Sequence, residues 1–256
     1  MVHRLLAPTA AFVVCLGCQE GASLSTARVT DVWGRPVAQA SVVVEGHFER
    51  LHTDTSGRVE LPERDPLAAT VIRVGRKGFI PVERSLTSDD VPRFELLPEP
   101  EEPGLHVVGD NHLVTLPSEP VTAVGSPLRS VRGIRSVGRV TVGERRPMVL
   151  FHTPLRRDEL MQLGLELRRL TFVPSMALPG PLGSTEVNVN LHVDAGRVPV
   201  SVTPLRERSD YRVVPEKDLE PGMYAFETQG LLSSRDSVLF DRLPLEFRMV
   251  YPFEVR

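Results

Sequence analysis

Short runs of alternating apolar and polar residues, separated by turn residues, dominate the chain beyond about residue 26. In the first part about seven such runs stand at residues 27–32, 40–46, 51–54, 58–61, 69–74, 78–82 and 93–97. The 23 prolines and 19 glycines of the chain stand mostly between short runs and not in a single tract. Because turn residues at this spacing delimit short strands and disfavour long helices, residues 26–98 are predicted to form an antiparallel β-sandwich.

Alternating proline and glutamate at residues 99–104 mark the clearest boundary in the sequence. Such a segment cannot supply a core and favours an extended, semi-rigid spacer. Residues 105–256 again have mainly strand-like patterns, so the fold class is predicted to be all-β, with a second mainly-β domain. No family resemblance is evident for this second half.

Three segments of the second half have specific expectations. Residues 105–108 and 112–116 should form a hairpin through 109–111. Residues 185–194 alternate strictly, which is typical of a half-buried strand, and should pair with 197–202 through Ala195 and Gly196. Residues 160–170 fit either a strand or a helical face, and the polar residues before them favour one helical turn leading into a strand.

The N-terminal segment has the layout of a bacterial export signal. A short basic start at His3 and Arg4 precedes an apolar run of about a dozen residues. A transmembrane helix needs about 20 apolar residues, so a removable signal peptide at residues 1–17 is expected in place of a permanent span.

Val14-Cys15-Leu16-Gly17-Cys18 resembles the lipobox of bacterial lipoproteins. The resemblance implies cleavage after the small residue Gly17 and acylation of the Cys18 sulfur, although Cys15 and Leu16 depart from the preferred residues. Two acyl chains suffice for stable membrane anchoring. The alternative is an ordinary signal peptide with an incidental cysteine.

Lipidation of Cys18 would leave residues 18–25 as a short polar tether between the membrane and the first domain. The mature chain would then hold no other cysteine, because Cys15 is the only other one in the sequence. Gln19 follows Cys18 where inner-membrane lipoproteins carry aspartate, so the resemblance favours the outer membrane of the cell envelope over the inner membrane.

Four spaced segments of residues 26–98 resemble the carboxypeptidase regulatory-like domain, a transthyretin-like β-sandwich. They lie at residues 32–37, 40–44, 53–59 and 75–79. The resemblance implies architecture and a non-catalytic adhesive, stabilising or partner-binding role. Gly34 and Pro36 should shape one corner, and Asp54 and Gly57 another. Trp33 is a possible binding platform, with a core or edge anchor as the alternative.

A search for reactive groups names no catalytic residue. Neither a zincin helix, a Gly-x-Ser-x-Gly elbow nor a phosphate-binding glycine loop occurs in the sequence. Asn188, Asn190, His192 and Asp194 are predicted to line one face of a strand, where they form a possible binding surface. Their spacing of about 6.5–7 Å is poor for a closed metal site, so a solvated sheet face is the alternative. We expect no metal and no cofactor.

Composition and charge exclude one class of partner. The net charge is −3, and arginines are interleaved with acidic residues, so nothing suggests a nucleic-acid surface. The sequence therefore predicts a non-catalytic, lipid-anchored envelope protein with a structural or protein-binding role. One alternative is a carbohydrate-binding module, against which the low aromatic content counts. The other is a hydrolase with a site around His152, His192 and Asp194.

Overall fold

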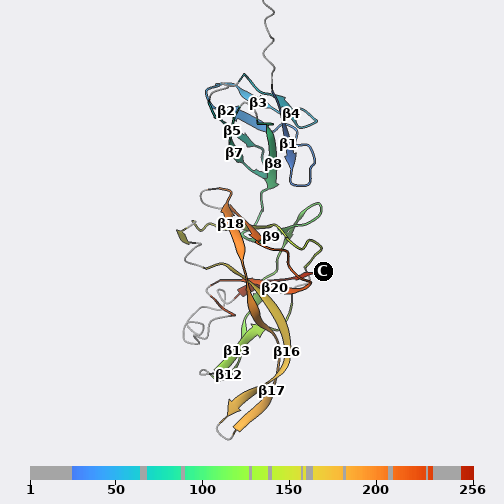
Figure 1. The fold of residues 1–256 in the computed structure, drawn as a ribbon, viewed down its shortest axis with the longest axis vertical. Coiled ribbons are helices and arrows are strands. Elements are labelled where there is room, and N and C mark those ends of the chain that lie inside the picture. Colours follow the sequence, from blue (N-terminus) through green and yellow to red (C-terminus); the bar gives the residue numbers. More distant parts are fainter. Residues whose placement is uncertain are drawn as a thin grey trace, which may run out of the picture.

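A computed structural model gives the fold of the chain (Figure 1). It describes residues 25–63, 68–87, 90–126, 129–137, 140–156, 158–159, 164–180, 183–206, 210–228, 230–232 and 249–256. Their regular structure is essentially all β-strand, which confirms the predicted fold class. No helix within these ranges is long and apolar enough to span a bilayer. Cys18 lies outside the described residues, as do the leader and tether up to residue 24.

The first eight strands form two sheets that face each other, which we call the first sandwich (Figure 1, top). Their bounds are β1 Thr26–Asp31, β2 Ser41–Val44, β3 Arg50–His52, β4 Arg58–Glu60, β5 Thr70–Gly75, β6 Phe79–Ile80, β7 Val82–Leu86 and β8 Arg93–Pro98. The sheet orders are β4-β1-β8-β6 and β3-β2-β5-β7. Neighbouring strands are antiparallel except β1 and β8, which run parallel and therefore start at the same end.

Alternation along the strands places every second side chain between the two sheets. In β1, Ala27 and Val29 are fully buried while Thr26 and Arg28 are exposed. The core of the first sandwich consists of Ala27, Val29, Val37, Ala40, Val42, Val44, Val59, Leu61, Ile72, Val74, Leu86, Phe94 and Leu96. Each large side chain moved from water into such a core contributes about 1.5–3 kcal/mol, so this packing stabilises the sandwich without a disulfide.

Strand directions collect the loops of the first sandwich at two ends. One end, which we call the N-terminal end, holds Ser25, the β2–β3 loop at 45–49, Thr87 directly after β7 and residues 90–92 before β8. The opposite end, the junction end, holds the turn after β1, the β3–β4 turn and the end of β8. The linker and the second half of the chain follow from the junction end.

The strands after the linker form the second sandwich. Their bounds are β9 Gly104–Val108, β10 Leu113–Thr115, β11 Glu119–Pro120, β12 Thr122–Ser126, β13 Arg129–Ile134, β14 Thr141–Val142, β15 Val149–His152, β16 Glu166–Gly180, β17 Gly183–Val198, β18 Val200–Pro204, β19 Asp210–Pro215, β20 Gly222–Glu227 and β21 Met249–Val255. One sheet is β10-β9-β15-β19-β18; the other is β11-β21-β20-β16-β17-β13-β12, with β14 on β21. No described strand pairs across the linker.

Both sheets of the second sandwich contribute to its main core. The core consists of Leu105, Val107, Leu116, Val142, Val149, Phe151, Leu167, Tyr211, Val213, Leu219, Tyr224, Phe226, Phe253 and Val255. Within it Phe253 stacks between Tyr224 and Phe226, with ring centroids 5.8 Å apart in each pair. A smaller cluster that includes Ile134, Leu170 and Val250 covers the other face of the larger sheet.

β16 and β17 continue beyond the second sandwich as a two-stranded ribbon (Figure 1, bottom). β16 pairs with β20 only over residues 166–170, and β17 pairs with β13 only at His192 and Val193. We call the described residues 171–180 and 183–192 of these two strands the ribbon. Along the described part of its tip, neither outer edge pairs with another named strand.

Two sequence expectations in this half have clear outcomes. The hairpin over 105–116 is confirmed, because β9 and β10 pair antiparallel. The hairpin through Ala195 and Gly196 is wrong: β17 runs on to Val198, and β18 pairs with β19. Arg169 faces Gly196 and Leu170 faces Asp194, so Ala195 is an extra residue in a β-bulge and not part of a turn.

The linker is held by contacts on both sides and does not separate the two sandwiches as a spacer would. The Glu99 N–H donates to the Gly78 carbonyl at 3.0 Å, and Pro100 is buried. Nε2 of the buried His106 lies 2.9 Å from the Glu102 carbonyl oxygen. This burial lowers the pKa of His106, which favours the neutral ring that can donate this hydrogen bond.

The β3–β4 turn depends on the two residues that the sequence singled out at this corner. The Asp54 carboxylate accepts hydrogen bonds from the Ser56 and Arg58 N–H groups, each at 2.8 Å, and the bond from Arg58 is the main reason its pKa is lowered. Gly57 has φ +73°, and a Cβ at this position would lie 2.4 Å from the Val29 carbonyl oxygen. Asp54 thus has a structural role in the turn, and only glycine fits at position 57 without displacing β1.

We expect Gly57→Ala to destabilise the first sandwich strongly. Left-handed backbone strain alone costs about 1–3 kcal/mol, and the clash with β1 adds to it. Gly46→Ala is the matched control, because Gly46 has φ +82° but nothing within 4 Å of the added Cβ. Urea unfolding, followed by the fluorescence of Trp33, the one tryptophan in the sequence, measures the stability of both variants. Equal losses of stability in the two variants would show that the contact with β1 is unimportant.

Candidate functional site

Apolar side chains from the two sandwiches meet at the junction end. Ile80 and Leu97 of the first sandwich and Val108 and Leu150 of the second form one buried cluster. Partly buried neighbours extend it from both sides: Val32, Trp33, Leu113, Met148 and Leu205. The two halves therefore share a small hydrophobic core, although no described strand connects them.

Trp33, predicted as a possible binding residue, is part of this junction. Its indole Nε1 donates to the Gly109 carbonyl of the second sandwich at 2.7 Å, and the Arg35 guanidinium lies 4.4 Å from the ring centroid. The buried Asp31 carboxylate accepts from the Trp33 N–H at 3.0 Å and from Arg35 Nε at 2.6 Å. These contacts fit the anchor alternative and leave the indole little freedom to act as a ligand platform.

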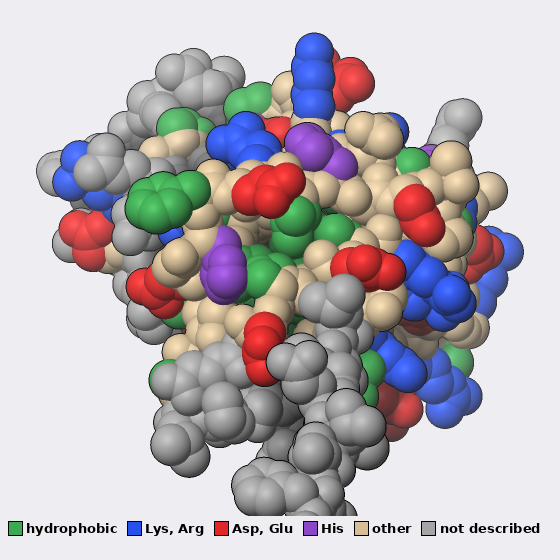
Figure 2. All heavy atoms as spheres, turned by 90° about the horizontal axis from the view of Figure 1, so that it is seen from above, with side chains coloured by type: hydrophobic (Ala, Val, Ile, Leu, Met, Phe, Trp, Pro, Cys, Tyr) green, Lys and Arg blue, Asp and Glu red, His purple; other side chains and the backbone are tan. Residues whose placement is uncertain are grey.

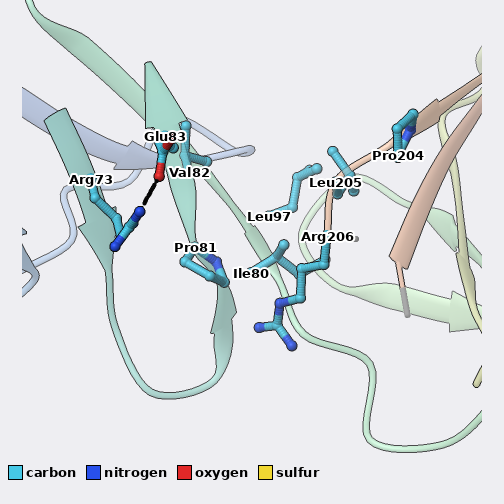
Figure 3. A pocket seen from close by; sticks show the side chains of 9 residues that line it. All are labelled: Arg73, Ile80, Pro81, Val82, Glu83, Leu97, Pro204, Leu205 and Arg206. Atoms are coloured by element: carbon cyan, nitrogen blue, oxygen red, sulfur yellow. Dashed lines mark hydrogen bonds and ion pairs between the residues drawn. The ribbon is translucent and has the colours of Figure 1, made fainter. Parts of the chain in front are cut away.

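A groove of about 610 Å³ opens beside this shared core (Figure 3). It is lined by Arg73, Ile80, Pro81, Val82, Glu83 and Leu97 from the first sandwich and by Pro204, Leu205 and Arg206 from the second. Figure 3 shows Ile80, Leu97 and Leu205 close together, with Arg73 and Glu83 joined by an ion pair farther along the wall. The lining is thus mostly aliphatic and has both charge signs.

Arg206 connects this groove to the linker and to the second sandwich. Its Nη1 lies 2.7 Å from a Glu99 oxygen, and its Nη2 is 3.4 Å from the Phe79 carbonyl oxygen. On the other side, Nε is 3.5 Å from Asp210, whose second oxygen lies 2.8 Å from Nδ1 of His152. The groove therefore has a fixed guanidinium, but its lining includes no serine, threonine, cysteine or histidine that could act as a nucleophile or base.

The other predicted site residues lie on β17, but not all on one face. Phe172 of β16 faces His192, whereas Ser175, three residues further on, faces Asn188. Side chains three positions apart on a regular strand point to opposite faces, so Asn188 and His192 lie on opposite sides of the ribbon. The predicted common face is therefore wrong.

A β-bulge at Asn190 causes this change of face. Asn190 has a backbone φ of +46°, in the left-handed region that asparagine adopts more readily than most residues. The register with β16 shifts by one residue here, between Val173 and Ser175. Asn188 and Asn190 are exposed, whereas His192 and Asp194 are half-buried.

His192 packs against an exposed aromatic side chain on the same face of the ribbon. The ring centroids of Phe172 and His192 are 5.1 Å apart, and 53% of Phe172 is exposed. Burial lowers the pKa of His192, and its Nδ1 is buried without a hydrogen-bond partner in the described part of the chain. The base of the ribbon thus presents an apolar aromatic surface with a neutral imidazole beside it.

A buried charge cluster lies where the ribbon meets the second sandwich. Arg168 Nε is 2.6 Å from Glu227, whose side chain is fully buried, and the same guanidinium contacts Glu166. Asp194 lies 3.5 Å from Arg168 Nη1. Glu227 also accepts a hydrogen bond from the Leu232 N–H at 2.5 Å. The cluster ties three strands and the turn after β20 together.

Opposing effects set the pKa values in this cluster. Burial raises the pKa of Glu227, and the Leu232 N–H and Arg168 only partly offset this. Burial by itself lowers the pKa of Arg168, but the carboxylates of Glu227, Asp194 and Glu166 together outweigh it, and the net pKa is raised. Sequence reasoning identified Asp194 but missed its partner Arg168, because strand periodicity does not show which residue of a neighbouring strand faces Asp194.

The residues named for the hydrolase alternative lie in different sheets of the described part of the chain. His152 lies on β15 in the five-stranded sheet and pairs with Asp210, whereas His192 and Asp194 lie on β17 in the other sheet. Among the described residues, no group of three or more His, Cys, Asp or Glu side chains could hold a metal ion. The nearest group of acids, Glu166, Asp194 and Glu227, contacts the guanidinium of Arg168.

Comparisons with known proteins give no further assignment, because no family model and no curated protein matches the chain.

We expect Arg168→Met to destabilise the second sandwich by about 3–5 kcal/mol, because it leaves the buried Glu227 without its cation. Arg197→Met is the matched control: Arg197 is 66% exposed and lies 3.5 Å from Glu166, so its loss should change stability by only about 0–1 kcal/mol. Chemical denaturation measures the folding stability of the two variants and of the parent.

The loss of folding stability caused by Arg168→Met should become smaller at lower pH. Without Arg168 the folded-state pKa of Glu227 rises further above its unfolded value, so protonation favours the folded variant as the pH falls. A loss of stability that does not depend on pH, or equal losses in the two variants, would contradict the role assigned to this cluster.

Proposed function

We propose that this chain is a non-catalytic, lipid-anchored cell-envelope protein that binds another envelope protein through the ribbon. The unpaired edges of the ribbon carry the proposal. A strand edge offers a row of backbone donors and acceptors that a second chain can extend, and natural proteins usually cover or shorten such edges. Here both strands of the ribbon extend well beyond their neighbours in the sheet.

Side chains on the ribbon support the same role. Phe172 is one of three large hydrophobic residues exposed among the described residues, and the ring of His192 packs against it. Aromatic side chains with this exposure are common anchors in protein interfaces. The ion pairs of Arg168 secure the base of the ribbon, so a bound partner would meet a surface that is already ordered.

The N-terminal sequence supports the anchored location. The apolar leader ends at Gly17 and Cys18 in the arrangement that resembles a lipobox, and Gln19 favours the outer membrane. Figure 2 shows basic and acidic side chains interspersed over the N-terminal end of the molecule. Such a mixed surface is unlike the basic face that nucleic acids require.

Neither alternative function gains an observation of its own. A carbohydrate site needs exposed aromatic rings gathered on one sheet face. Only Phe48 and Phe172 are strongly exposed aromatic residues in the described ranges, one on each sandwich. The enzyme alternative would need the side chains of His152 and His192 to meet in one cleft, and they belong to different sheets.

Cys18→Ala should abolish incorporation of a palmitate analogue and release the protein from the membrane fraction. The acyl chains supply the membrane affinity, and no other group in the mature chain can replace this thiol. Metabolic labelling followed by fractionation compares the variant with the parent. Cys15→Ala is the control and should label like the parent. Equal labelling of the parent and Cys18→Ala would refute anchoring at Cys18.

Shortening the ribbon should remove partner binding without unfolding the sandwich. Replacing residues 174–190 with Asn-Gly joins Val173 to Leu191, which already face each other, through a favoured two-residue turn. Pull-down from envelope extract should lose the proteins captured by the parent, while Asn188→Ser, which keeps the ribbon, should retain them. Capture of the same proteins by the shortened variant would exclude the unpaired strand edges of residues 174–190 as the binding surface.

A further inference from the structure

Two exposed apolar side chains lie at the N-terminal end of the first sandwich, one on a loop of each sheet. Phe48, in the β2–β3 loop, is fully exposed, and Val91, just before β8, is 68% exposed. They are two of the three large hydrophobic residues exposed in the described ranges; the third, Phe172, is on the ribbon. Single exposed apolar residues are common on protein surfaces, so their shared location is the informative feature.

The strand register places this pair beside the point where the chain enters the fold. β1 and β8 run parallel with Arg28 facing Arg93, so two residues earlier Val91 is level with Thr26. The Arg28 N–H donates to the Pro92 carbonyl at 2.9 Å and fixes this segment against β1. The β2–β3 loop reaches the same end because β7 ends there before β8 begins, β5 is antiparallel to β7, and β2 is antiparallel to β5.

The spacing of the lipidation residue orients this end, and this step rests on the proposed function. Seven residue steps separate Cys18 from Ser25, the first described residue. A fully extended chain spans about 3.3–3.6 Å per residue, so the acylated sulfur lies at most about 25 Å from Ser25. The end that carries Phe48 and Val91 is therefore the end nearest to the bilayer.

Neighbouring charges indicate which kind of bilayer suits this end. Glu49 directly follows Phe48, Glu45 lies at the start of the same loop, and Asp90 directly precedes Val91; all three are exposed. Asp90 is held in place by the Thr87 N–H and hydroxyl, at 2.7 and 2.9 Å. Arg50 and Arg93, each two residues from one of the apolar side chains, are exposed too. Because the described part of this end carries both charge signs and no basic cluster that would favour an anionic surface, it suits zwitterionic headgroups.

We propose that Phe48 and Val91 insert into the headgroup region of a zwitterionic bilayer and hold the first sandwich upright on it. Two side chains bury too little apolar surface to recruit the protein by themselves. The acyl chains supply the affinity, and Phe48 and Val91 set the orientation. The ribbon, at the other end of the molecule, then points away from the membrane (Figure 1).

Tryptophan quenching in vesicles tests this orientation. Acylated Phe48→Trp protein is reconstituted into phosphatidylcholine vesicles with and without brominated acyl chains. Trp33, the single native tryptophan, lies at the junction end and provides the unquenched background. Phe172→Trp is the matched control, because it makes the same substitution at an exposed position on the ribbon. The Cys18→Ala form of Phe48→Trp should not bind the vesicles.

The expected result is loss of Phe48→Trp emission with brominated lipid, and unchanged emission from the parent and from Phe172→Trp. Anionic lipid should not be needed for the quenching, because no basic cluster lies on the described surface of this end. No quenching of Phe48→Trp in acylated protein would overturn the docking while leaving the anchor intact. If labelling shows no acyl group on Cys18, a maleimide phospholipid can be coupled to Cys18 in a protein whose Cys15 is replaced by alanine. Comparing the quenching of Phe48→Trp and Phe172→Trp in this lipid-coupled protein then tests the orientation without the natural anchor. Equal quenching of both variants, or self-association through Phe48 seen by cross-linking, would also refute it.

Discussion

The packing of Ile80 and Leu97 against Val108 and Leu150 is the contact on which the arrangement of the whole molecule depends. Each sandwich closes its own sheets, and these few apolar residues decide how the two lie relative to each other. Around them Trp33 and Arg206 each make polar contacts that cross from one half to the other. The junction end of the first sandwich is therefore occupied, whereas the N-terminal end and the ribbon are free for the membrane contact and the protein contact proposed above.

Local pattern predicted the first sandwich well because its strands alternate between one core and solvent. β1 and β2 show this directly, with buried residues at every second position. β7 was largely missed, because Val82 is only half-buried and Leu86 alone is fully buried, which leaves almost no apolar signal. The parallel pairing of β1 with β8 also could not be read from sequence, since strand pattern does not specify a partner.

The candidate site was harder to predict because it depends on irregularities in strands and on distant charges. Strict alternation in residues 185–194 suggested one polar face, but the left-handed backbone of Asn190 moves Asn188 to the opposite side. The partner of Asp194 is Arg168, on a neighbouring strand, and the fully buried acid beside it is Glu227. A carboxylate in such a place requires its cation, so the pair becomes evident only once the strands are assembled.

The absence of any described strand pairing across the linker has a thermodynamic consequence. Backbone ladders usually make unfolding cooperative, but here the halves share only a small side-chain cluster and a few hydrogen bonds. The coupling free energy between them is therefore small compared with the free energy that folds either one. Denaturation should proceed in two separable transitions, and a single melting temperature would describe neither half.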